Sequence, residues 1–181
     1  MQASELFNQP NTILLDGGMG TMLQAAGMKL GTRPEDLNIE NPELIRSIHA
    51  KYAAAGSRVV NANTFGASPH KLADSKYTLE EVITAGIANC KQAVAPYGAL
   101  VTLDVGPLGE LLEPSGTLAF EDAVAEYGRI VRAGVAAGAD ILYFETFTDL
   151  YEMKAALLAA KENSTLPIMA LSLIHISEPT R

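Results

Sequence analysis

Short apolar runs alternate with longer stretches of helical periodicity along this chain, and that alternation limits its possible folds more than any other feature. The apolar runs lie at 13–16, 58–65, 99–105, 139–146 and 167–171. The stretches with apolar residues at three- and four-residue spacing lie at 42–55, 79–95, 120–137 and 150–161. Because the runs are apolar throughout instead of alternating in and out, they indicate parallel strands buried on both faces. We therefore expect an α/β protein.

The expected helices carry start and stop signals. Asn41 precedes a first-turn proline, Thr78 is followed three positions later by a glutamate, and Asp149 stands before the last helical stretch. Gly56 and Gly138 stand where a left-handed residue commonly ends a helix.

An internal repeat sets the length of one strand-helix unit. The segment 54–65 recurs in pattern and register as 136–147, 82 positions further on. With one unit between the copies, each unit is about 41 residues long, and a closed eight-unit barrel would need about 300 residues. The 181-residue chain then holds four units and a fifth strand, of either a barrel or an open sheet.

Composition excludes several classes of function. The 21 acidic and 13 basic residues give a net charge of -8, which disfavours a nucleic-acid partner. The N-terminus lacks the pattern of a signal peptide, and no apolar stretch reaches the roughly 18 residues of a membrane span. The single cysteine, Cys90, excludes an internal disulfide. We expect a cytoplasmic protein without a membrane partner.

Polar side chains follow four of the expected strands. Both barrels and open parallel sheets place their chemistry at these carboxyl ends. The residues are Asp16, Asn63, Asp104 and Glu145. Any one of them could equally cap the following loop or helix, but a carboxylate is costly to bury without a partner, so the set favours a binding site. An amino group on a ligand would be such a partner.

A glycine-rich segment, 16–21, follows the first expected strand. Its glycines let the backbone approach a ligand and offer N–H groups to a carboxylate or a phosphate. It lacks the spacing of a dinucleotide fingerprint and the ending of a P-loop, and a simple tight turn is the alternative. Together with the carboxylate of Asp16, it would suit an amino acid.

Four segments carry a resemblance to a known family: 16–24, 61–67, 105–109 and 144–147. In order and pattern they resemble the homocysteine S-methyltransferases, and are most similar to the N-terminal homocysteine-binding domain of cobalamin-dependent methionine synthases. The match runs from about residue 12 to residue 170. It implies a (β/α)8 TIM barrel of which this chain holds the first four βα units and part of the fifth strand.

The resemblance also implies a substrate site and cofactors. The implied substrate-binding residues are Asp16, Gly17, Gly18, Asn63, Asp104 and Glu145. Of these, Asp16 and Glu145 would hold the amino group of homocysteine and the two glycines its carboxylate, with the others in support. In the family, zinc held by three cysteines of the later strands deprotonates the substrate thiol, which then attacks a methyl donor. In methionine synthases, folate- and cobalamin-binding domains supply methylcobalamin and recharge it from methyltetrahydrofolate.

The chain departs from the family at the metal. Cys90 lies inside the expected helix 79–95, and His49 and His70 have no partner at metal-ligand spacing. We therefore expect no metal site in this chain, the cysteine ligands lying in a C-terminal half that it lacks. We also expect the fragment to be inactive alone.

The last eleven residues need a separate interpretation. One back-translation of 171–181 resembles the transposon-end adapter used to prepare shotgun sequencing libraries. We therefore expect residues 1–170 to be the N-terminal half of the homocysteine-binding barrel and 171–181 to be a non-native tail, so that His175 is not a ligand.

Two other readings stay open. The chain could be a natural half-barrel that binds an amino acid without catalysis, although its open edges and uncovered interior would then need a partner. It could also belong to another TIM-barrel enzyme that acts on an amino acid or a phosphorylated substrate.

Overall fold

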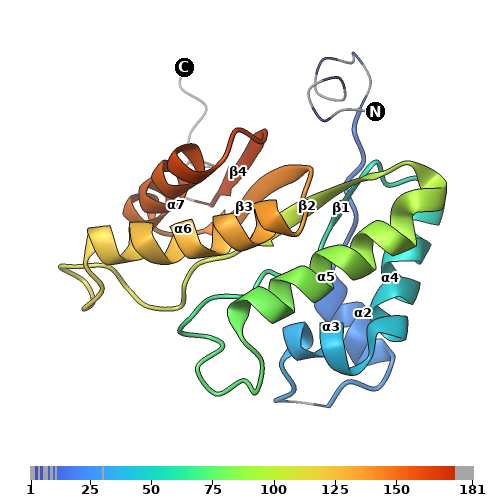
Figure 1. The fold of residues 1–181 in the computed structure, drawn as a ribbon, viewed down its shortest axis with the longest axis horizontal. Helices are drawn as coiled ribbons and strands as arrows, with labels where there is room; N and C mark the ends of the chain where they lie inside the picture. Colours follow the sequence, from blue (N-terminus) through green and yellow to red (C-terminus); the bar gives the residue numbers. More distant parts are fainter. Residues whose placement is uncertain are drawn as a thin grey trace.

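Four parallel strands form one sheet in which neighbours along the chain are neighbours in space. The computed structural model describes residues 12–29 and 31–173, together with residues 3, 5, 8 and 10. The strands are β1 (Val59–Asn61), β2 (Leu100–Val105), β3 (Ile141–Phe147) and β4 (Ile168–Ser172). Their order in the sheet is β1-β2-β3-β4 (Figure 1). Every connection between them is therefore a crossover between adjacent strands.

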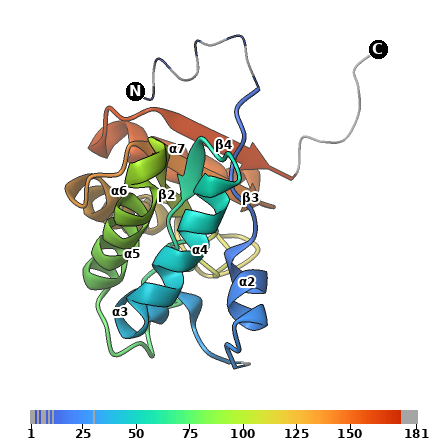
Figure 2. The ribbon, with the colours of Figure 1, turned by 90° about the vertical axis from the view of Figure 1, so that its right-hand side faces the viewer.

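The long helices cover one face of this sheet. They are α4 (Pro42–Ala54), α5 (Leu79–Val94), α6 (Phe120–Ala136) and α7 (Leu150–Asn163). Figures 1 and 2 show them on the same side of the strands, and the main hydrophobic core lies between the two layers. A doubly wound sheet carries helices on both faces, whereas a barrel carries them only outside. The expected fold class is confirmed: the chain forms part of a (β/α)8 barrel.

The inner face of the sheet changes character along the strands. Near the amino ends Val59, Leu100 and Ile141 are buried together with Ala3, and Met169 packs on them. Two residues further along, the same face carries the polar side chains of Asn61, Thr102 and Tyr143, and then Asp104 and Glu145. Since alternate residues of a strand share a face, the apolar floor and the polar rim follow directly from the strand sequences.

Two expected strands are shorter than predicted. The run 13–16 is not a full strand: Leu15 forms a single parallel bridge to Val59, and the Asp16 N–H donates to the Val59 carbonyl at 3.1 Å. The run 58–65 is a strand only as far as Asn61. Beyond it the Thr64 N–H donates to the Ala62 carbonyl at 2.8 Å, which turns the chain out of the sheet.

The predicted helix signals are confirmed. The side chain of Asn41 accepts from Leu44, Thr78 forms a reciprocal capping box, and Asp149 accepts two N–H groups of α7. The repeat is also structural, since Gly56 and Gly138 have φ angles of 109° and 87° and donate to Ala53 and Val135. The shorter elements are α2 (Met19–Ala25), η1 (Pro34–Asp36), α3 (Leu37–Glu40) and η2 (Ala95–Tyr97).

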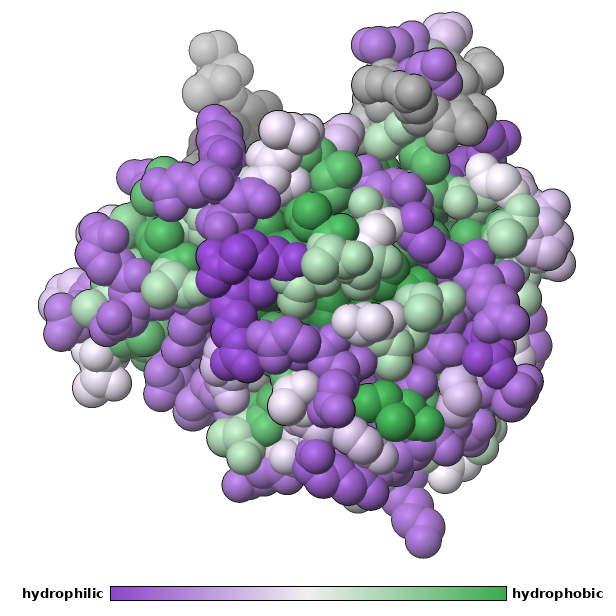
Figure 3. All heavy atoms as spheres, viewed as in Figure 1, coloured by the Kyte–Doolittle hydropathy of each residue, from purple (hydrophilic) through white to green (hydrophobic). Residues whose placement is uncertain are grey.

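The remaining expectations concern the surface and the chain end. Figure 3 shows polar and apolar side chains interspersed over the helical face. Within the described residues, no helix is long and apolar enough to cross a membrane. At the chain end, β4 includes Leu171 and Ser172, and the Leu173 N–H donates to the Phe147 carbonyl at 2.9 Å. The rest of the expected tail, with His175, lies outside the described residues, and the domain boundary stays a prediction.

Candidate functional site

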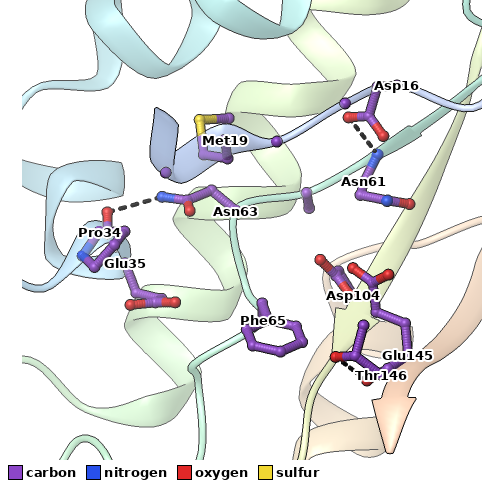
Figure 4. A pocket seen from close by; sticks show the side chains of 14 residues that line it. Asp16, Met19, Pro34, Glu35, Asn61, Asn63, Phe65, Asp104, Glu145 and Thr146 are labelled. Atoms are coloured by element: carbon purple, nitrogen blue, oxygen red, sulfur yellow. Dashed lines mark hydrogen bonds between the residues drawn. The ribbon is translucent and has the colours of Figure 1, made fainter. Parts of the chain in front are cut away.

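A cavity of about 470 Å³ opens at the carboxyl ends of the strands. Fourteen residues line it, and ten of them are labelled in Figure 4. The six predicted site residues, Asp16, Gly17, Gly18, Asn63, Asp104 and Glu145, are all among them. The structure therefore brings together side chains from four separate segments of the sequence, and their role in binding stays a prediction.

Asp16 reaches the cavity from the segment beside β1. Its Oδ2 accepts the Asn61 N–H at 3.0 Å, while its Oδ1 is buried and has no hydrogen-bond partner in the described part of the chain. Burial raises the pKa of Asp16 to about 7. The hydrogen bond from Asn61 lowers this pKa, and the negative charge of Glu145 raises it further. Near neutral pH this carboxyl group is therefore divided between its protonated and ionised forms.

Asp104 and Glu145 form a carboxyl pair from adjacent strands. Figure 4 shows their side chains side by side, close enough for the charge of Glu145 to act on Asp104. Asp104 is 7% exposed, and burial followed by the charges of Glu145 and Asp16 raises its pKa well above the ordinary value. Burial also raises the pKa of Glu145, and the neighbouring polar groups of Tyr143 and Asp104 oppose that rise.

The backbone around the pair is held by a threonine. The buried Thr64 hydroxyl donates to the Asp104 carbonyl at 2.8 Å and accepts the Asp104 N–H at 3.1 Å. Asp104 Oδ1 is nevertheless buried with no partner among the described groups. A buried carboxylate oxygen left unpaired is unfavourable unless a ligand donates to it.

The glycine-rich loop packs tightly on α4. The Tyr52 hydroxyl donates to the Gly18 carbonyl at 3.2 Å, and the Thr21 hydroxyl donates to the same oxygen at 3.1 Å. A Cβ atom on Gly17 would lie 3.0 Å from the Tyr52 ring. The close approach explains a glycine here, and it fixes the backbone of this loop at the cavity wall.

Asn63 lines the cavity, but its side-chain amide is hydrogen-bonded to other residues of the protein. Its Nδ2 donates to the Pro34 carbonyl at 2.8 Å and to Asn38 Oδ1 at 2.9 Å. In return Asn38 Nδ2 donates to the Asn63 carbonyl at 2.8 Å. These bonds join the loop after β1 to η1 and α3, so the structure places Asn63 as a support for that wall.

Eight further lining residues are not among the predicted site residues, and three of them, Glu35, Phe65 and Thr146, bring large or polar side chains to the cavity. Glu35 is 6% exposed and accepts the Gly66 N–H at 2.7 Å, and burial raises its pKa. The sequence around Glu35 has a proline and two acids in succession, the pattern of an ordinary first helical turn, so it gives no local sign that Glu35 lines a cavity. Phe65 lies two positions after Asn63, and Thr146 directly follows Glu145. No local sequence signal marks either of them as a cavity residue.

The cavity is strongly acidic. Asp16, Glu35, Asp104 and Glu145 contribute four carboxyl groups, and none of the fourteen described lining residues is basic. The ammonium group of Lys71 is nearby, 5.3 Å from the Phe65 ring centroid, but it donates to the Pro107 carbonyl at 2.6 Å and does not line the cavity. Such a site favours a positively charged group on its ligand.

The described residues do not fit a metal held by three thiolates. Cys90 is fully buried in α5, with its Sγ 3.8 Å from the Val60 carbonyl on the helical side of the sheet. His49 is also fully buried, and desolvation lowers its pKa to about 4, while His70 is paired with Glu110 at the surface. In the described ranges, no three His, Cys, Asp or Glu residues are arranged to hold a metal ion.

Comparison with known proteins agrees with this architecture. The methionine synthase of Mycobacterium tuberculosis is 29% identical over 163 residues, which cover 83% of this chain and 14% of that protein. The oxidized form of the homocysteine methyltransferase MmuM from Escherichia coli superimposes with a TM-score of 0.79 and 26% identity, over 90% of this chain and 62% of that one. Its metallated form gives a TM-score of 0.76 at 24% identity, over 92% and 64%.

The chain thus spans less than two thirds of the length of these relatives. The family model for homocysteine S-methyltransferases matches residues 13–180, nearly the whole chain. This chain belongs to the homocysteine S-methyltransferase family.

Proposed function

We propose that this chain forms the homocysteine-binding part of a methyltransferase that converts homocysteine to methionine, of the methionine synthase type. The observation that carries the proposal is the acidic cavity at the carboxyl ends of the parallel strands, beside a glycine backbone that contains no side chain to block it. Carboxylates on one side and backbone N–H groups on another are the complement of an amino acid.

Different residues bind different groups of the ligand. Asp16 and Glu145 accept N–H bonds from the ammonium group, and the backbone of Gly17 and Gly18 donates to the substrate carboxylate. Asp104 lies beside Glu145 and contributes a third carboxyl group to the ammonium site. The ligand's cation then supplies the donor that the buried oxygens of Asp16 and Asp104 lack within the described chain.

The methyl transfer needs groups beyond these residues. The substrate sulfur forms a bond to the methyl carbon while that carbon leaves its donor, and the thiol proton is released. Since the described residues do not fit a zinc ion, they account for recognition of the amino acid and not for activation of its thiol. In an intact protein of the methionine synthase type, folate- and cobalamin-binding domains would provide the methyl group from methyltetrahydrofolate.

A phosphorylated substrate fits the cavity less well. Four carboxyl groups would repel a phosphate dianion, and no cationic side chain is present among the described lining residues to offset that repulsion. A half-barrel that binds an amino acid without catalysis shares the same cavity and differs only in lacking a methyl-transfer step.

The test is calorimetric titration of protein expressed from its complete reading frame with L-homocysteine and with 4-mercaptobutyrate, which lacks only the amino group. We expect homocysteine to bind more tightly, and Glu145→Gln to weaken its binding by roughly 10- to 100-fold, as for loss of a hydrogen bond between charged groups.

Glu121→Gln is the matched control, because Glu121 is exposed on α6 and does not line the cavity. It should bind like the unchanged protein. Equal affinity for the two ligands would refute the ammonium site. Methionine formation, assayed separately with methylcobalamin, distinguishes the enzyme from a protein that only binds.

A further inference from the structure

The end of β3 contains an extra residue. Phe144 pairs with Ala170 and Phe147 pairs with Ser172, so three steps along β3 match two along β4. Residues three apart in a regular strand face opposite sides of the sheet. Here Phe144 and Phe147 are both fully buried in the helical core, with ring centroids 6.5 Å apart, and each lies against Tyr127. The bulge therefore returns Phe147 to the side occupied by Phe144.

The two residues inside the bulge share the other side. Glu145 and Thr146 both line the cavity, as Figure 4 shows, although consecutive strand residues normally point in opposite directions. A regular β3 would place Glu145 in the cavity and Thr146 among the helices. The bulge thus adds a second polar side chain to the acidic site.

The bulge holds Thr146 in an unfavourable conformation. Its φ angle is 60°, and every other positive φ in the described chain belongs to a glycine. A β-branched residue is a rare occupant of this left-handed region, which glycine and asparagine adopt more readily. Such strain clusters at ligand sites, and a strained side chain that lines a cavity motivates a functional hypothesis.

The hydroxyl of Thr146 is oriented by the strand itself. Its Oγ1 donates to the Glu145 carbonyl at 2.8 Å, which uses its proton and leaves the lone pairs of the oxygen as acceptors. Because Glu145 and Thr146 line the same cavity, this acceptor is suited to the ligand that the Glu145 carboxylate binds. We propose that Thr146 is a substrate-contact residue whose hydroxyl accepts one N–H of the ligand's ammonium group, next to the one bound by Glu145. This inference rests on the proposed function.

Three substitutions of Thr146 distinguish a direct contact with the ligand from a purely structural role. Thr146→Gly removes the hydroxyl and relieves the strain, Thr146→Val keeps the shape without the hydroxyl, and Thr146→Ser keeps the hydroxyl. Calorimetry on protein from the complete reading frame should give a roughly tenfold weaker Kd for homocysteine in Thr146→Gly and Thr146→Val. Thr146→Ser should stay within about threefold of the unchanged protein, and Thr146→Gly should melt no lower.

4-Mercaptobutyrate distinguishes a lost contact from a distorted cavity. Because it has no ammonium group, its affinity should change less than twofold in Thr146→Gly. If Thr146→Gly binds homocysteine as tightly as the unchanged protein, or loses affinity for both ligands equally, Thr146 is not a contact of the ammonium group, while the proposed function stands. If the unchanged protein does not prefer homocysteine over its deaminated analogue, the proposed function fails and this inference fails with it.

Discussion

Asp104 is a cavity side chain whose negative charge is unfavourable where it lies. It is 7% exposed, one of its oxygens is buried without a partner in the described chain, and its closest charged neighbours are carboxyl groups. Desolvation and like charge both favour its protonated form. A ligand cation reverses this balance, because it stabilises the ionised form of every carboxyl group that it contacts. Occupancy and protonation at this site are therefore linked.

This linkage predicts a pH dependence of binding. Below its pKa of about 7, Asp16 holds a proton that an ammonium group must displace. The affinity for homocysteine should therefore rise as pH increases from about 5.5 to 7, by up to tenfold per unit. Calorimetry in buffers with different ionisation enthalpies should detect proton release on binding near pH 6.

4-Mercaptobutyrate controls for the thiol proton, since it carries the same thiol without an amino group. Its affinity should be nearly independent of pH over the same interval, and Asp16→Asn should flatten the profile for homocysteine. A homocysteine profile as flat as that of its deaminated analogue would contradict the linkage. The sign for folding follows the same reasoning: a raised carboxyl pKa lowers stability as pH rises from about 4 to 7, because only the folded state keeps the proton.

At the scale of helices and strands, a buried network of side-chain amides connects several elements. Asn63 bonds Pro34 and Asn38, and Asn89 Nδ2 donates to the Asn38 carbonyl at 2.8 Å. Arg46 of α4 donates to Asn89 Oδ1 at 2.9 Å. This hydrogen-bond network joins the loop after β1 to η1, α3, α4 and α5. It fixes the turn from which Glu35 enters the cavity.

Replacement of Asn63 tests whether it supports the wall or binds the ligand. Asn63→Ala leaves the Pro34 carbonyl and Asn38 Oδ1 without these donors, which should destabilise the protein by about 2–4 kcal/mol. For a domain of this size we expect the melting temperature to fall by roughly 5–15 °C, measured by calorimetric scanning.

Asn163→Ala is the matched control, because Asn163 is only partly buried at the end of α7 and its bond to Arg132 is exposed. It should cost under about 1 kcal/mol. An Asn63→Ala protein of unchanged melting temperature that no longer binds homocysteine would reassign Asn63 as a ligand contact.

The whole molecule has the one-sided layering of a barrel that is not closed. The helices α4, α5, α6 and α7 cover the outer face, while β4 and the segment 13–16 form the two edges of the described sheet. Leu14 is 54% exposed at one edge and Leu171 is 38% exposed at the other. Parallel edges of this kind are normally paired. Further strands paired with these edges would supply the remaining walls of the cavity.

This arrangement makes a prediction about metal content. We expect the source DNA, sequenced outward from the codons of 167–170, to continue into a second barrel half with one cysteine and then a neighbouring cysteine pair. Protein from that longer frame should contain about one zinc per chain by elemental analysis, and the 181-residue chain little. A stop codon after residue 181, or stoichiometric zinc in the short chain, would contradict the prediction.

Local signals in the sequence determined the order of the elements, most helix boundaries and the polar ends of the strands. Periodicity and caps such as Asn41, Thr78 and Asp149 act within one helical turn, so they can be read without knowledge of distant contacts. The same information located Asp16 and Glu145 at strand ends, although it did not establish what they bind.

Only the tertiary structure decided how the ends of the strands and the neighbouring loops come together around the cavity. The run 13–16 forms one bridge because a ladder requires a paired neighbour, and the amide of Asn63 is engaged by residues 25 and 29 positions away. Glu35 becomes part of the cavity because a buried amide chain holds its turn there. Thr146 faces the cavity because the core takes Phe147 on the opposite side. These outcomes depend on register and long-range packing, which no short stretch of sequence encodes by itself.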